Sequence, residues 1–150
     1  MTLSDFFTRE RISLELTGDT RDDVLGALVS LMALDERAEA TLSRTLRRRE
    51  SLGSTGIGRG IAIPHCRSLT VRRLCLAYGR HCDGIDFHAI DNRPVHHFFL
   101  IVAPPVEVSV QYLPVLGRLA QFAKHRDVPA KLTGLRSADE FFRLLESKGV

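Results

Sequence analysis

The segment Val95-His-His-Phe-Phe-Leu-Ile-Val-Ala103 (VHHFFLIVA) is apolar on both alternating faces over most of its length. A strand with this pattern is buried on both sides, as in a sheet that helices cover on its two faces. Pro104-Pro105 ends the segment. The pattern therefore predicts the central strand of an α/β domain.

Segments on either side of this strand supply the rest of such a domain. Shorter apolar or alternating runs predict further strands at 11–16, 61–63 and 74–78. Helical spacing of apolar residues, with capping residues such as Thr20 and Ser137, predicts helices over about 20–34, 36–50, 109–120, 127–135 and 137–147. In the helix that Ser109 opens, we expect the inward face to carry Leu113, Leu116, Leu119 and Ala120.

Composition and length bound what kind of protein this is. The 150 residues are 44% hydrophobic and 26% charged, which excludes wholesale disorder and suffices for one core without disulfide or metal staples. With no repeat or linker, residues 1–150 are expected to form a single domain. The net charge of +3 suits an acidic or phosphorylated partner without implying nucleic acid.

The cysteines and the first residues point to a cytoplasmic protein. Cys66, Cys75 and Cys82 are odd in number and form no C-x-x-C pair, so we expect reduced thiols. Residues 1–16 are interrupted by charges, which predicts no signal peptide. The longest apolar run, 98–103, is too short to span a bilayer, so no membrane embedding is expected.

A glycine-rich stretch, Gly53 to His65 (GSTGIGRGIAIPH), delivers a histidine directly after a short apolar run. Its glycine spacing fits neither the dinucleotide fingerprint nor the Walker motif, and Ser54 does not form a nucleophile elbow. A Gly-Ser-Thr-Gly loop can turn backbone N–H groups and the hydroxyls of Ser54 and Thr55 toward an anion. Arg49, at the end of the preceding helix, is a natural counter-charge for phosphate.

His65 is the reactive group that this arrangement predicts. Pro64 removes a ladder donor, so His65 is expected where a strand gives way to an open edge. Neutral imidazole has a nucleophilic nitrogen near pH 7, which suits it to accept a phosphoryl group beside an anion cradle. The alternative is that His65 only ends a strand in a tight turn.

The stretch RESLGSTGIG (49–58), followed by GIAIPH (60–65), resembles the signature of type-2 EIIA domains of the bacterial phosphoenolpyruvate-dependent phosphotransferase system. The nitrogen-regulatory (PtsN-like) branch is the most similar. The likeness extends through LSDFF near the start, IDF at 85–87, FFLIVAP at 98–104 and LPVLGRLA at 113–120.

The resemblance implies a fold, a role and partners. The fold would be an α/β sandwich with a mixed sheet flanked by helices, as in mannitol- and fructose-type EIIA domains. His65 would accept a phosphoryl group from an HPr-type phosphocarrier, supported by Arg49, Ser54 and Thr55, with no cofactor. Phosphorylation would regulate targets such as potassium-transport or sensor-kinase proteins.

One position departs from the family pattern. Many members carry a second histidine, in H-L-x-x-L, at the start of the helix after the FLxVAP strand. Tyr112 stands at that position here. A phenol can donate a hydrogen bond to phosphate or imidazole, but it cannot share a proton near neutral pH as histidine does. Two alternatives stay open: a sugar-specific EIIA that passes phosphate to a cysteine of a separate EIIB domain, and a binding module without phosphotransfer.

Other histidines and arginines suggest no further site. His81, His88, His96 and His97 have no zinc-ligand spacing with the cysteines, so no metal is expected. Arg44, Arg47 and Arg48 form a basic helix end without interleaved aromatic residues, so no nucleic-acid partner is expected.

Overall fold

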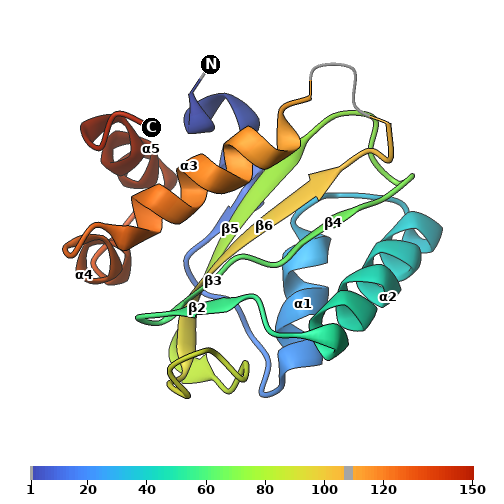
Figure 1. Ribbon diagram of the computed structural model, residues 1–150, viewed down its shortest axis with the longest axis horizontal. Helices are drawn as coiled ribbons and strands as arrows, with labels where there is room; N and C mark the ends of the chain where they lie inside the picture. Colours follow the sequence, from blue (N-terminus) through green and yellow to red (C-terminus); the bar gives the residue numbers. More distant parts are fainter. Residues whose placement is uncertain (1, 107–109) are drawn as a thin grey trace.

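In the computed structural model, which describes residues 2–106 and 110–150, a six-stranded mixed sheet separates two groups of helices (Figure 1). The strands are β1 (Ile12–Ser13), β2 (Gly56–Gly58), β3 (Ile61–Ala62), β4 (His65–Arg67), β5 (Cys75–Ile85) and β6 (Val95–Ala103). The helices are η1 (Leu3–Phe6), η2 (Arg9–Arg11), α1 (Arg21–Ser30), α2 (Glu36–Leu52), α3 (Tyr112–Lys124), α4 (Val128–Thr133) and α5 (Ala138–Ser147).

β6 is the central strand, as its apolar pattern predicts. It pairs antiparallel with β5 on one side and parallel with β3 and β4 on the other. The sheet order is β1-β5-β6-β3-β2, and β1 runs parallel to β5. The predicted mixed sheet flanked by helices is therefore confirmed.

Two apolar cores lie on the opposite faces of this sheet. The first contains Tyr78, Phe99, Leu119, Phe122 and Phe141, and it joins the sheet to α3, α4 and α5. The second contains Leu25, Leu28, Leu42, Leu46 and Phe98, and it joins the sheet to α1 and α2. Adjacent residues of β6, Phe98 and Phe99, thus point into different cores, as alternation along a strand requires.

Three predicted elements differ from the observed ones. The strand predicted at 11–16 forms only over Ile12–Ser13, since η2 takes Arg11; further on, Leu16 N still donates to Arg80 O of β5 at 2.8 Å. β5 runs on to Ile85, well past the predicted end at 78, with an irregular register between Arg80 and Ile85. The helix predicted through 34 ends at Ser30, and Ala33 adopts a positive φ of 55°.

The inward face of α3 also needs a correction. Leu113 was expected to point inward, but it is 71% exposed, whereas Tyr112, Val115, Leu119 and Phe122 are buried. Leu116 and Ala120 are partly buried against the core, as expected. The predicted start at Ser109 lies outside the described residues.

Within the described residues, no helix is both long enough and apolar enough to cross a membrane.

Candidate functional site

His65 begins β4, beside the central strand. β3 and β4 pair with β6 in the same register, since Ala62 lies opposite Phe98 and His65 opposite Ile101. They form one line along β6 that is interrupted at Ile63-Pro64, where proline has no N–H to donate. The carbonyl of Pro64 still accepts a 2.9 Å hydrogen bond from Ile101 N. The backbone of His65 is therefore fixed by the sheet, while its side chain is half-buried.

A backbone carbonyl fixes the tautomer of the His65 ring. Nδ1 lies 2.7 Å from the carbonyl oxygen of Ile63. A carbonyl oxygen only accepts hydrogen bonds, so Nδ1 must carry the proton of the neutral ring. The lone pair then resides on Nε2, which is the nitrogen able to act as a nucleophile.

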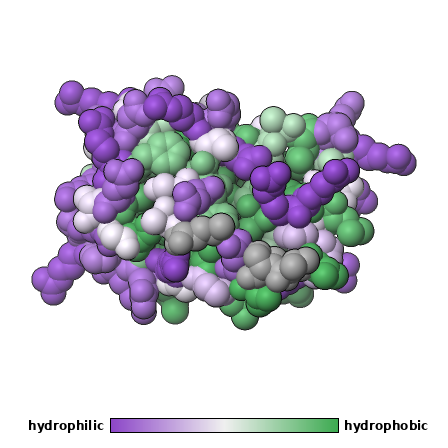
Figure 2. Space-filling model, turned by 90° about the horizontal axis from the view of Figure 1, so that it is seen from above, coloured by the Kyte–Doolittle hydropathy of each residue, from purple (hydrophilic) through white to green (hydrophobic). Residues whose placement is uncertain are grey.

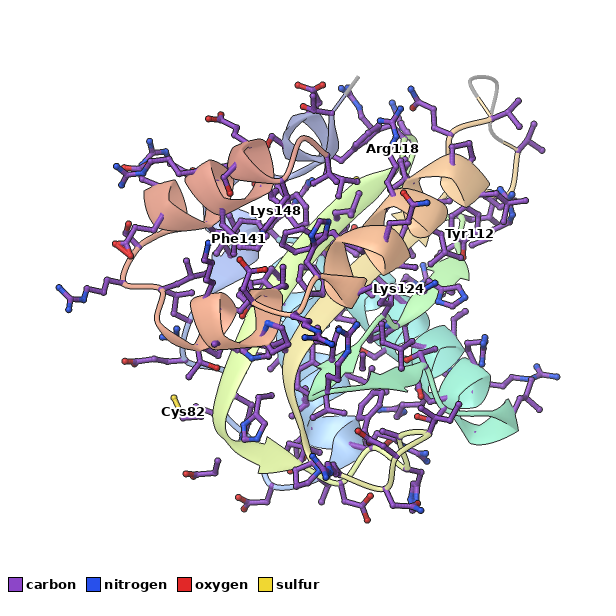
Figure 3. All side chains as sticks on the ribbon, turned by 60° about the vertical axis from the view of Figure 1, so that its left-hand side comes forward. Cys82, Tyr112, Arg118, Lys124, Phe141 and Lys148 are labelled. Atoms are coloured by element: carbon purple, nitrogen blue, oxygen red, sulfur yellow. The ribbon has the colours of Figure 1, made fainter. Side chains whose placement is uncertain are left out.

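Tyr112 and Arg67 lie beside this histidine. The rings of His65 and Tyr112 meet edge to face with centroids 6.3 Å apart. Cζ of Arg67 lies 4.7 Å from the centroid of the Tyr112 ring, a cation–π contact, and Arg67 Nη1 donates to Pro104 O at 3.0 Å. Figure 3 shows Tyr112 at the start of α3, on the opposite side of the molecule from Cys82.

Arg67 was not predicted as a site residue, although one signal was available. Residues two apart on a strand share a face. Since His65 starts a strand, Arg67 follows on the same side, and only the buried Cys66 separates them.

The polar loop after α2 is held by bonds within the protein. Ser54 Oγ donates to Phe87 O at 2.5 Å and accepts from Gly56 N at 3.0 Å. Thr55 donates its N–H (3.1 Å) and its hydroxyl to the carboxylate of Glu50. The two hydroxyls that were expected to face an anion thus donate elsewhere, and Ser54 and Thr55 shape the loop.

Glu50 is a second residue that sequence reasoning missed. Its side chain is buried, with 2% exposure of the residue, at the end of α2. Thr55 O in turn accepts a 3.0 Å bond from Ile63 N, and Ile63 carries the carbonyl that holds His65. Composition and periodicity gave no sign that Glu50, the residue after Arg49, would be buried.

The two arginines of the motif region, Arg49 and Arg59, each donate to backbone carbonyls. Arg49 Nη1 donates to Gly53 O at 2.8 Å, which ties the end of α2 to the loop. Arg59, in the turn between β2 and β3, donates to the carbonyls of Ala123 and Lys124 at the end of α3. Tyr112 stands about 18 Å away at the other end of that helix, so Arg59 is not beside His65.

The remaining histidines lie away from His65. His97 is buried between Tyr78 and Thr133, with Nδ1 2.8 Å from the Tyr78 hydroxyl. His96 Nδ1 contacts the carbonyl of His81, and His88 is exposed. The described part of the chain holds no cluster of three or more His, Cys, Asp or Glu residues that would suit a metal ion.

The family model and the relatives that match this chain point to the same protein family. The family model for the phosphoenolpyruvate-dependent sugar phosphotransferase system, EIIA 2, matches residues 5–148. A nitrogen regulatory protein of Bradyrhizobium diazoefficiens is 30% identical over 146 residues, which cover 97% of this chain and 95% of that protein.

Two further relatives bear on fold and context. A fructose-specific EIIABC component of Bacillus subtilis is 30% identical over 152 residues; these cover 97% of this chain but only 23% of that protein. The crystal structure of nitrogen regulatory protein IIA-Ntr from Neisseria meningitidis superposes with a TM-score of 0.86 at 27% identity, covering 95% of this chain and 98% of that one.

Proposed function

Because the chain belongs to the type-2 EIIA family of the phosphoenolpyruvate-dependent phosphotransferase system, we propose that it takes a phosphoryl group from an HPr-type phosphocarrier onto Nε2 of His65. It is a phosphotransferase in the sense of a carrier, which accepts and hands on one group. We assign this role to a single domain, residues 1–150, acting in the cytoplasm; the one mixed sheet of the described residues supports this assignment.

The observation that carries the proposal is the bond between His65 Nδ1 and Ile63 O. In the neutral ring it leaves Nε2 unprotonated, and His65 is the half-buried histidine that ends the family's Ile-Pro-His segment. A nucleophilic nitrogen that needs no base to deprotonate it can attack phosphorus directly. Arg49, Ser54 and Thr55 support this site by fixing the loop, and Tyr112 supports it by contact with the ring.

A regulatory role is favoured over sugar transport. The Bradyrhizobium nitrogen regulatory protein matches this chain along nearly the whole length of both proteins. We therefore propose that the phosphorylation state of His65 governs binding to regulatory targets, such as potassium-transport or sensor-kinase proteins. The second candidate function is transfer of the phosphoryl group to a separate EIIB domain. The similarity to a fructose-specific EIIABC component supports this candidate.

The experiment supplies phosphoenolpyruvate, enzyme I and an HPr-type carrier, and follows the mass of the protein. We expect one acid-labile phosphoryl group on the wild type and none on His65→Ala. An EIIB domain is then added, and retention of the label favours the regulator whereas its loss favours the sugar-specific candidate. A wild type that acquires no label would contradict phosphotransfer and leave a binding module.

A further inference from the structure

Arg67 is the cation that the structure places on the same side of the strand as the reactive histidine. We propose that Arg67 binds the phosphoryl group carried by His65, an inference that rests on the proposed function. The observations that carry it are the strand geometry, the contact with Tyr112 and the N–H donors that the Arg67 guanidinium keeps beside its bond to Pro104 O.

The strand geometry brings Arg67 to the histidine. His65 and Arg67 are the first and last residues of β4, opposite Ile101 and Ala103 of β6. Side chains two apart on a strand leave the same face at points about 6.6 Å apart. A guanidinium at the end of its flexible stem covers that distance, whereas Cys66 between them turns into the core.

The ring of Tyr112 contacts the side chains of both His65 and Arg67. It meets the His65 ring at 6.3 Å and the Arg67 guanidinium at 4.7 Å, so one phenol contacts both. Arg67 Nη1 is further tied to Pro104 O. A guanidinium carries five N–H donors, so this single bond leaves donors for phosphoryl oxygens.

The side chains of Arg49 and Arg59 donate to backbone carbonyls of other segments. Arg49 Nη1 donates to Gly53 O, which closes the end of α2. The Arg59 guanidinium donates to two carbonyls at the far end of α3. Arg67 differs from both in that its guanidinium lies against the ring of Tyr112, which also meets the ring of His65.

The transfer step is balanced without a proton leaving either ring. The lone pair on His65 Nε2 forms the new bond to phosphorus, and the donor's P–N bond breaks with its electron pair staying on the donor ring nitrogen. The proton of His65 stays on Nδ1, which goes on donating to the carbonyl oxygen of Ile63. Negative charge passes from the donor's surroundings to the face of β4, where Arg67 neutralises it.

The first test compares phosphorylation rates of Arg67→Ala with those of Arg72→Ala, an exposed arginine five residues further on. Loss of one charge-stabilising donor lowers such rates by about 10²–10³-fold, and we expect this in the rate constant of phosphoryl transfer to Arg67→Ala. Arg72→Ala should leave the rate unchanged, and Arg67→Lys should restore part of it. Melting curves of the variants check that they are folded.

The second test reads the bound state. If Arg67 contacts the phosphoryl group on His65, Arg67→Ala should shift the transfer equilibrium toward the carrier by about tenfold. In a Tyr112→Ala background, which removes the stacking surface, the effect of Arg67→Ala on rate should shrink.

Two outcomes would overturn the inference. One is an Arg67→Ala variant with the wild-type rate constant and equilibrium of transfer, while His65→Ala abolishes labelling; the proposed function would then stand without Arg67. The other is a wild type that acquires no label at all, which removes the proposed function and this inference with it.

Discussion

His65 and the residues around it show how a motif sets chemistry through backbone contacts. The reactivity of Nε2 follows from one carbonyl, that of Ile63, rather than from a charged side chain. Ile63 itself is placed by Thr55, which the buried Glu50 holds by two hydrogen bonds. The R-E-x-x-G-S-T segment thus positions His65 indirectly, through hydrogen bonds that run from Glu50 to Thr55, Ile63 and the His65 ring.

Arg49 offers a prediction about this indirect support. Arg49→Ala removes the bond from Nη1 to Gly53 O, and the loosened loop should slow phosphoryl transfer by about 10²-fold, as a small misplacement of a reacting group does. Stopped-flow or quench labelling measures the rate. Arg48→Ala, an exposed neighbour on the same helix, is the matched control. Equal slowing in both variants would mean that the arginines act only as diffuse charge.

Tyr112 carries the second prediction at this scale. Tyr112→Phe keeps the ring against His65 and Arg67 and should lower the transfer rate only modestly. Tyr112→His should keep activity and add a pH-dependent step near 6.5, visible in a rate–pH profile. A profile of Tyr112→His that matches the wild type would argue against a role beside the phosphoryl group.

Among the elements, the β2–β3 hairpin explains the glycines of the motif. Gly60 has a φ of +79°, a conformation that side chains rarely adopt, and it closes the turn into β3. A Cβ on Gly56 would lie 2.7 Å from Cβ of Ala89, so the backbone approaches the loop before β6 too closely for any side chain. These glycines therefore serve the hairpin and its packing.

Elements whose bounds are set by local sequence pattern could be predicted from the sequence, whereas elements whose bounds are set by tertiary contacts could not. β6 has the predicted bounds, and the hydrogen bond from Asp23 N to Thr20 Oγ1 confirms the predicted cap of α1. Both features depend on residues that are neighbours in the sequence. The second half of β5 was missed because its pairing with β6 is irregular and several of its residues are polar or exposed.

The candidate site divides in the same way. His65 and Tyr112 were predicted by motif and resemblance, and the structure brings their rings together. Arg67 and Glu50 were missed because their importance depends on Tyr112 and Thr55, which only folding brings to them. The error at Leu113 arose because α3 carries two apolar stripes, and the sheet alone selects the one with Tyr112 and Val115.

His97, on β6, gives a pH prediction about packing between elements. Burial, reinforced by the neighbouring His96 and Arg80, lowers the pKa of His97 to about 4. An unfolded histidine titrates near 6.5, so between pH 6.5 and 4 the unfolded chain binds a proton that the folded one refuses. The free energy of unfolding must therefore fall as pH drops through that window.

The measurement is urea unfolding at pH 7 and pH 5, with His97→Gln as the comparison. The wild type should lose about 2 kcal/mol more than this variant, which has no imidazole to protonate. An equal loss in both proteins would show that other groups govern the acid sensitivity.

Over the whole molecule, the two cores and the sheet between them form a rigid support for the site. The surface is mixed: viewed from above, hydrophilic side chains dominate one end, while hydrophobic surface gathers toward the side of the β6–α3 connection (Figure 2). Exposed apolar residues near this connection and around β4 include Leu69, Val106, Val110 and Leu113. A partner that contacts this region would lie close to the charge on His65.

Phosphorylation should act as a switch in charge rather than in fold. It adds about two negative charges at a half-buried side chain whose backbone is paired to β6. We expect amide chemical-shift changes confined to residues near His65, Arg67, Tyr112 and the 53–56 loop. Changes spread through both cores would contradict this and indicate a conformational transition.

The most direct test of the account is to locate the phosphoryl group on the imidazole itself. Nitrogen-15 and phosphorus-31 NMR of the phosphorylated protein, labelled in its histidines, resolves which ring nitrogen carries phosphorus. The account predicts a phosphorus–nitrogen coupling at Nε2 of His65, with Nδ1 still protonated and bonded to Ile63 O. Phosphorus on Nδ1 of His65, or on any other residue, would contradict it.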